Sequence, residues 1–128
     1  MIDHISFGVT DMERSKRFYD TALAPLGIKR FHDMDFGSGY GRSAELALFW
    51  IGYPLDRSKK ASAGPGTHVA FTAESRVDVD AFYAAAIAAG GRDNGKPGLR
   101  PEYTPNYYGA FVLDPDGHNV EAVCHKPA

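Results

Sequence analysis

Residues 4–27 read HISFGVTDMERSKRFYDTALAPLG, and residues 68–91 read HVAFTAESRVDVDAFYAAAIAAGG. The two stretches align without a gap at an offset of 64 residues, in a chain of 128. Seven positions are identical in this alignment: His4 and His68, Phe7 and Phe71, Phe18 and Phe82, Tyr19 and Tyr83, Ala22 and Ala86, Ala24 and Ala88, and Gly27 and Gly91. The match predicts two related halves, and a pseudo-two-fold arrangement would bring together the histidines that open the two copies.

Each copy has the pattern of a strand followed by a helix. Apolar side chains alternate from Ile2 to Val9, as in a half-buried strand, and the run from Thr10 to Glu13 has the Thr-x-x-Glu form of a capping box. In the second copy, residues alternate from His68 to Ala73, a second cap begins at Ser75, and Gly90-Gly91 ends the helix. Both copies therefore predict a strand and an amphipathic helix in the same order.

Further strand signals follow each helix. We expect strands at residues 28–34, 36–42 and 45–51 in the first half, and at 109–113 and 119–124 in the second. Each half then has the order β-α-β-β-β, although no strand is evident directly after the second helix. Gly and Pro breaks predict a long loop at residues 94–106. The expected fold class is α+β, in a single domain of residues 1–128. Its first module spans about 1–52, its linker 53–66 and its second module about 67–128.

The composition is that of an ordinary globular protein. The chain is 44% apolar and 23% charged with a formal charge of −2, which gives no reason to expect nucleic acid or an anionic membrane surface as a partner. No apolar stretch is long enough to span a membrane, and no signal peptide is visible. The single cysteine, Cys124, excludes an intrachain disulfide, so the expected location is the cytoplasm.

Three side chains indicate a metal site. His4 and His68 open equivalent strands, on faces that otherwise carry small residues and so leave space. Glu121 lies on the polar face of the last predicted strand. Imidazole and carboxylate groups suit one divalent ion of Zn, Ni, Co, Mn or Fe. The alternative is that these histidines have only a structural role, because an isolated histidine at a strand start usually binds no metal.

Longer motifs make the chain resemble the vicinal oxygen chelate superfamily. His4-Ile5-Ser6-Phe7 leads to Arg17-Phe18-Tyr19, and residues 111–121 read FVLDPDGHNVE. With the repeated β-α-β-β-β unit, these motifs resemble glyoxalase I, fosfomycin-resistance enzymes, extradiol dioxygenases and bleomycin-resistance proteins. The resemblance covers nearly the whole chain. It implies paired modules that form a mixed, cup-shaped, incomplete barrel around one divalent metal ion.

The resemblance also implies a ligand set. By family position the ligands would be His4, His68 and Glu121, and the fourth strand can supply another. Glyoxalase I has a Glu-Leu-x-x-x-Trp run there, which the segment starting at Glu45 matches. A shifted register would instead place an apolar residue such as Leu48 at the metal, so both alternatives stay open.

Glyoxalase I-like lyase or isomerase chemistry is the first expectation from this resemblance. In that reaction a glutamate ligand acts as base beside a metal-polarised oxygen, which gives Glu121 the catalytic role. Gly8 stands where similar bacterial enzymes carry an arginine for the glutathione carboxylate, so the resemblance does not imply glutathione as the thiol.

Three alternatives follow from the same resemblance. Extradiol dioxygenases use His, His and Glu with Fe(II), but Phe111 stands where their signature has a tyrosine. Thiol transferases of the fosfomycin-resistance type share the ending from Asp114 to Glu121, whereas the dense set of phosphonate-binding cations is not evident. Bleomycin-resistance proteins bind a small molecule without metal and normally lack the three ligand positions.

The expected partner is a small-molecule substrate. The resemblance places Trp50 next to the cup, either as a wall of the pocket or as part of the core. Residues in or beside the long loop offer an arginine among aromatics, which can hold a carboxylate or phosphate or can pack the loop itself. These loop residues are Arg100, Tyr103, Tyr107 and Tyr108. The resemblance also implies a homodimer, with modules paired within one chain or between two.

Overall fold

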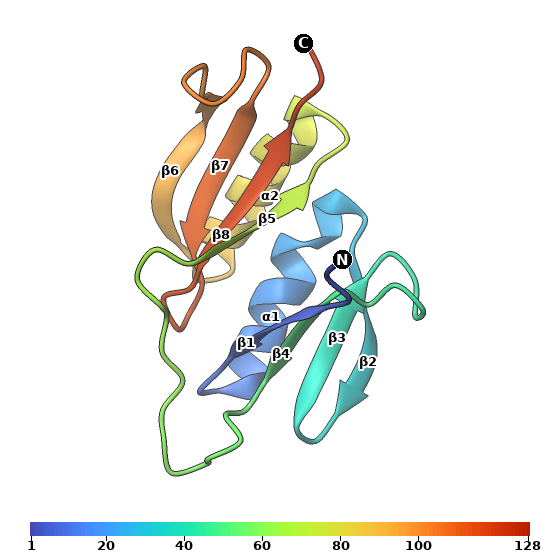
Figure 1. Ribbon diagram of the computed structural model, residues 1–128, viewed down its shortest axis with the longest axis vertical. Helices are drawn as coiled ribbons and strands as arrows, with labels where there is room; N and C mark the ends of the chain where they lie inside the picture. The colour runs from blue at the N-terminus through green and yellow to red at the C-terminus, as the bar shows by residue number, and fades with distance from the viewer.

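The computed structural model describes residues 1–128 as two four-stranded sheets and two α-helices (Figure 1). The first half contains β1 (Ile5–Gly8), α1 (Met12–Ala22), the 3-10 turn η1 (Ala24–Leu26), β2 (Lys29–Met34), β3 (Gly37–Gly41) and β4 (Phe49–Gly52). The second half contains β5 (His68–Thr72), α2 (Arg76–Ala88), β6 (Arg92–Leu99), β7 (Tyr108–Leu113) and β8 (Asn119–Cys124). No helix has the length and apolar content that a membrane span requires.

The two sheets have the same topology. Their strand orders are β1-β4-β3-β2 and β5-β8-β7-β6. The β1–β4 and β5–β8 pairs are parallel, and the other pairs are antiparallel. The predicted α+β class with two β-α-β-β-β modules is therefore confirmed. Each sheet is open, and the two sheets do not close into a barrel.

Two predicted strand boundaries differ from the structure. The strand expected from Glu45 begins only at Phe49, because residues before it form a turn in which the Leu46 amide donates to the Ser43 carbonyl. Residues 92–99 form β6, although residues from 94 on were expected to form a loop. The pairing of β6 with β7 shifts register around Gly95, and such irregularities let a strand accept residues that normally break one.

Both helices begin at a side-chain cap. The Ser75 hydroxyl accepts a hydrogen bond from the Asp78 amide, as the sequence predicts. In the first helix the cap is Asp11, whose carboxylate accepts from the Arg14 amide at 3.1 Å, rather than Thr10. An aspartate is the stronger cap of the two, since its charge also favours the positive end of the helix.

A single hydrophobic core is shared by both halves. The two helices pack against each other, and one cluster of buried residues includes Phe18 of α1 and Phe82 of α2, both with no exposed surface. Across the halves, Phe49 and Phe71 meet edge to face with ring centroids 5.1 Å apart. Burying a phenylalanine contributes roughly 1.5–3 kcal/mol, so contacts between halves are a substantial part of the stability.

The turn before β8 joins the second half to the first. The Tyr19 hydroxyl donates to the buried carboxylate of Asp114 at 2.6 Å. The His118 ring lies parallel to the Phe7 ring with centroids 4.2 Å apart, and its Nε2 lies 2.7 Å from the Gly8 carbonyl oxygen. The motif with the strongest family resemblance thus forms an inter-module contact.

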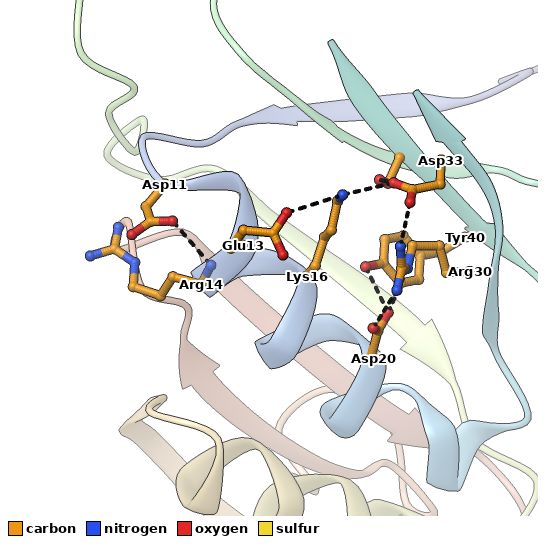
Figure 2. A network of polar contacts seen from close by, with 9 residues as sticks. Asp11, Glu13, Arg14, Lys16, Asp20, Arg30, Asp33 and Tyr40 are labelled. Atoms are coloured by element: carbon orange, nitrogen blue, oxygen red, sulfur yellow. Dashed lines mark hydrogen bonds and ion pairs between the residues drawn. The ribbon is translucent and has the colours of Figure 1, made fainter. Parts of the chain in front are cut away.

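A network of charged and polar side chains fixes α1 to β2 and β3 (Figure 2). Lys16 reaches Asp33 at 2.8 Å, and Arg30 contacts both Asp33 and Asp20. The Tyr40 hydroxyl donates to Asp20 at 3.0 Å. Hydrogen bonding by Lys16 lowers the pKa of Asp33 to about 2, whereas burial raises the pKa of Tyr40 far above its usual value.

Candidate functional site

Strand alternation gives the first sheet one face on the core and one face away from it. In β4, Phe49 and Ile51 are buried in the core, so Trp50 points to the other side, which we call the first open face. Gly39 lies opposite Trp50 in the neighbouring strand, and a Cβ atom on Gly39 would lie 2.7 Å from the indole ring. The indole therefore lies directly over the glycine backbone.

The first open face contains the largest hollow of the molecule, of about 810 Å³. His4 and Glu45 both line it, together with Trp50. His4 is about half exposed, and its Nδ1 lies 2.7 Å from the Asp3 carboxylate. Glu45 is exposed in the turn before β4. Two of the predicted ligand positions thus share this hollow.

Trp50 is held by the backbone around it. Its Nε1–H donates to the Ala47 carbonyl at 2.9 Å, and its ring lies within 15° of parallel to the His32 ring. His32 in turn contacts the Ala44 carbonyl through Nε2 at 2.8 Å. His32 has no counterpart in the 64-residue repeat, where Lys96 stands, so the repeat does not single it out.

The second sheet has a corresponding second open face, which carries His68 and Glu121. The parallel pairing of β5 and β8 places Glu121 opposite Ala70, so both site residues lie on one face of adjacent strands. His68 Nε2 lies 3.2 Å from Glu121 Oε1. The His68 side chain is 45% exposed, whereas Glu121 is fully buried. This pair is the part of the predicted ligand set that the structure brings together.

Tyr107 completes the surroundings of Glu121. Its hydroxyl donates to Glu121 Oε2, and burial together with this hydrogen bond raises its pKa well above the usual value, so it stays a donor at neutral pH. Gly109 leaves room for this contact, since a Cβ there would lie 2.9 Å from Oε2. The signal in the sequence is alternation, which places Tyr107, Gly109 and Phe111 on one face.

The other oxygen of Glu121, Oε1, is buried and accepts no hydrogen bond, because His68 Nε2 lies 3.2 Å away without the geometry of one. A buried carboxylate oxygen without a partner is costly, and a cation beside it removes that cost. An imidazole nitrogen and a carboxylate oxygen at this separation are suitable donors for a divalent metal ion. His68 and Glu121 therefore fit one half of a metal site.

The chain does not bring His4 into a cluster with that pair. It contains no group of three or more His, Cys, Asp or Glu side chains that could hold a metal ion. His4 and Glu45 line the first open face, whereas His68 and Glu121 lie on the second. The physical reason is that the halves contact each other through their helices and the Asp114 turn, which leaves the two ligand pairs on separate sheets.

Strand register identifies the counterpart of Glu121 in the first half. Glu121 pairs with Ala70, two residues after His68, and Trp50 pairs with Ser6, two residues after His4. Trp50 thus holds the place of Glu121, and Glu45 lies outside the equivalent strand. The position that would supply a fourth ligand by symmetry carries an indole ring.

The loop residues expected near the substrate have varied surroundings. Arg100 donates to the carbonyls of Gly98 and Lys96 at 2.9 and 2.8 Å, so it holds the backbone of β6. Tyr103 is 61% exposed and lies edge to face against Tyr107. The Tyr108 hydroxyl instead donates to Asp80 of α2 at 2.7 Å, which places this tyrosine on the helix side of the sheet.

Comparisons with known proteins agree with this architecture. Residues 1–122 match the model of the Glyoxalase/Bleomycin resistance protein/Dioxygenase superfamily. A crystal structure of a glyoxalase/bleomycin resistance protein from Albidiferax ferrireducens T118 is 35% identical, covers 97% of both chains and has a TM-score of 0.84. A glyoxalase I mutant from Zea mays is 26% identical, with a TM-score of 0.68 over 95% of this chain and 45% of that one. An uncharacterized Bacillus subtilis (strain 168) protein, YqjT, is 29% identical over 94% of this chain and 95% of its own length.

Proposed function

Since this chain belongs to the Glyoxalase/Bleomycin resistance protein/Dioxygenase superfamily, we propose that it is a divalent-metal-dependent enzyme with glyoxalase I-like lyase or isomerase chemistry. The observation that carries the proposal is the pair formed by His68 and Glu121. The buried carboxylate has one oxygen without a hydrogen-bond partner, 3.2 Å from the imidazole nitrogen. That oxygen is where a metal ion would be held, because the cation would compensate the buried charge.

We further propose that a second copy of the chain completes the ligand set with its His4. Asp3 and Ile5, the neighbours of His4, line an apolar groove of about 470 Å³ that extends to β5. Exposed apolar side chains lie in the same groove: Ile2, Leu46 and Leu48. Burial of such side chains is the main driving force of association, so this edge suits a homodimer whose first open face meets the partner's second.

The chain's own residues have defined tasks in this mechanism. His68, Glu121 and the partner's His4 would hold the metal ion, which would supply Lewis acidity toward adjacent oxygens of the substrate. Glu121 removes a proton from the carbon beside the carbonyl and returns it to the neighbouring carbon, so the isomerisation neither gains nor loses a proton. Tyr107 holds Oε2 of Glu121, so Oε1 is the oxygen that faces both the metal position and a substrate bound beside it.

One observation favours a second candidate, an extradiol-type dioxygenase. Trp50 holds the place that corresponds to Glu121, which leaves His4, His68 and Glu121 as a set of two histidines and one carboxylate. Such a set with open positions is typical of Fe(II) enzymes that activate oxygen. A metal held by this set would leave positions open to substrate and oxygen.

The deciding experiment measures metal content and turnover together. Protein purified without chelator is compared with its His68→Ala and Glu121→Gln variants, and the exposed Glu102→Gln serves as the matched control. We expect bound metal in the wild type and control, its loss in His68→Ala, and conversion of a hemithioacetal with Ni(II), Co(II) or Zn(II). Oxygen consumption with a catechol and Fe(II) would establish the second candidate instead. Absence of metal from all four proteins would overturn both and leave metal-free small-molecule binding.

A further inference from the structure

The floor of the hollow on the first open face is formed by the backbone of β3 and carries few side chains. Glycines occupy the three positions on this face in β3, and none of them leaves room for a side chain. A Cβ at Gly37 would lie 2.6 Å from the Ile51 carbonyl oxygen, and one at Gly39 would lie 2.7 Å from the Trp50 ring. The centre of the floor is thus bare backbone, with the indole of Trp50 above it.

The aromatic surface on this floor is rigid before any ligand arrives. The Trp50 and His32 rings are nearly parallel with centroids 5.4 Å apart, and each ring is fixed by a hydrogen-bonding contact with a backbone carbonyl. Both rings line the hollow. A preorganised stacking surface loses little conformational entropy on binding, and it favours planar rings over flexible aliphatic groups.

A single guanidinium stands over the same hollow. Arg57 is the one Arg or Lys side chain among the lining residues, and its guanidinium carbon lies 3.8 Å from the centroid of the Tyr53 ring. The structure gives Arg57 no ion pair; of the two acids that line the hollow, Asp3 is paired with His4 and Glu45 is exposed. A guanidinium positioned by an aromatic ring and free of an acid is suited to accept a planar anion in a bidentate contact.

We propose that the hollow of the first open face binds flat aromatic carboxylates, with the ring stacked at Trp50 and His32 and the carboxylate held by Arg57. The volume of about 810 Å³ accommodates a substrate of one or two rings. This inference deepens the proposed function, on which it rests, by naming the substrate class of the hollow that contains His4. The binding itself requires no metal, so it can be tested separately from catalysis.

The test uses 2-naphthoate on protein kept in chelator. Trp50 is the only tryptophan, so its indole N–H gives one NMR signal that reports on this hollow alone. We expect 2-naphthoate to shift that signal. We also expect Arg57→Gln to weaken the affinity for 2-naphthoate, measured by calorimetry, about tenfold, which is the usual loss for a charge-assisted contact. The neighbouring Lys59→Gln is the matched control and should bind as the wild type does.

Two ligand controls separate the ring from the charge. The neutral isostere 2-naphthamide should bind Arg57→Gln and wild type equally, and cyclohexanecarboxylate should leave the indole signal in place. The assignment to Arg57 would be overturned if Lys59→Gln lost as much naphthoate affinity as Arg57→Gln does. It would also be overturned if the wild type bound naphthamide as tightly as naphthoate. An indole signal unmoved by naphthoate would overturn the location. Metal content and turnover of the same protein without chelator then show whether the proposed function stands or fails independently.

Discussion

The two open faces differ in the residues at one pair of equivalent positions on neighbouring strands. In the first sheet Gly39 of β3 pairs with Trp50 of β4, and in the second Phe111 of β7 pairs with Glu121 of β8. The first half therefore has a large ring over bare backbone, and the second has a buried carboxylate beside a large ring. The two halves share a topology and a histidine at the same strand position, but they differ in what stands beside it.

The largest effect expected from this difference concerns the two carboxylates. Glu121→Gln should reduce turnover by about 10²-fold or more, since it removes the base and a charged ligand. Glu45→Gln should retain most of the activity, because Glu45 is exposed and lies outside the strand position equivalent to Glu121. Steady-state kinetics on the two variants measures the contrast. Equal losses would show that the first half also carries a ligand carboxylate.

A mixing experiment tests whether one metal site takes His68 from one chain and His4 from a second chain. His4→Ala and His68→Ala should each be inactive alone, because every shared site then lacks one histidine. After mixing and subunit exchange, half of the dimers are mixed and each has one intact site, so activity should recover to about one quarter of wild type. No recovery, with exchange demonstrated by mass spectrometry, would place both histidines of a site in one chain.

A smaller effect is expected at the glycine beneath the indole. Gly39→Ala forces a Cβ against the Trp50 ring and should lower the free energy of unfolding by about 1–3 kcal/mol, the usual cost of overpacking. Its NMR signature is a shift of the indole N–H signal. The counterpart change Phe111→Ala should leave that signal in place, since Phe111 lies on the other sheet. A shift in both variants would show that the two faces are coupled.

The smallest effect is the pH dependence that Asp33 gives to the stability of the first half. Lys16 and Ser38 lower the folded-state pKa of Asp33 from 3.8 to about 2. A lowered carboxyl pKa stabilises the folded state above the unfolded-state value and loses this contribution as the pH falls through the folded-state value. Denaturant titrations of wild type and Asp33→Asn should therefore differ above about pH 4 and converge toward about pH 2. Asp93→Asn in β6 is the counterpart, where a backbone amide is the main cause of the lowered pKa; its difference should be less sensitive to salt.

Much of the fold could be predicted from the sequence, because its determinants are local. Period-two alternation predicted the last strand at 119–124, and the cap at Ser75 began the second helix as expected. The strand at 92–99 was missed because its glycines and proline normally break strands, and only the pairing with β7 overrides that preference. The stability of β6 depends on its pairing with β7, and a local sequence pattern does not reveal which strand will be the partner.

The candidate site was predictable only in part. The repeat offset of 64 residues pairs the two histidines, but it pairs Glu121 with Arg57. In the structure Glu121 corresponds to Trp50, an offset of 71 residues, because the second half is longer between its helix and its last strand. Tyr107 was grouped with its loop neighbours, although its alternation with Gly109 and Phe111 is the sequence signal that places it on the face of Glu121.

The Asp114 turn has a consequence for how the chain reaches its native state. Its contacts with Tyr19 and Gly8 join residues 95 and 110 positions apart, so they contribute strongly to contact order. During synthesis, α1 leaves the ribosome long before its partner Asp114 exists, and the Tyr19 hydroxyl stays unpaired until nearly the whole chain has emerged. Chains dominated by such distant contacts fold slowly. We therefore expect completion of the last strand to be the event that commits both halves to the native state.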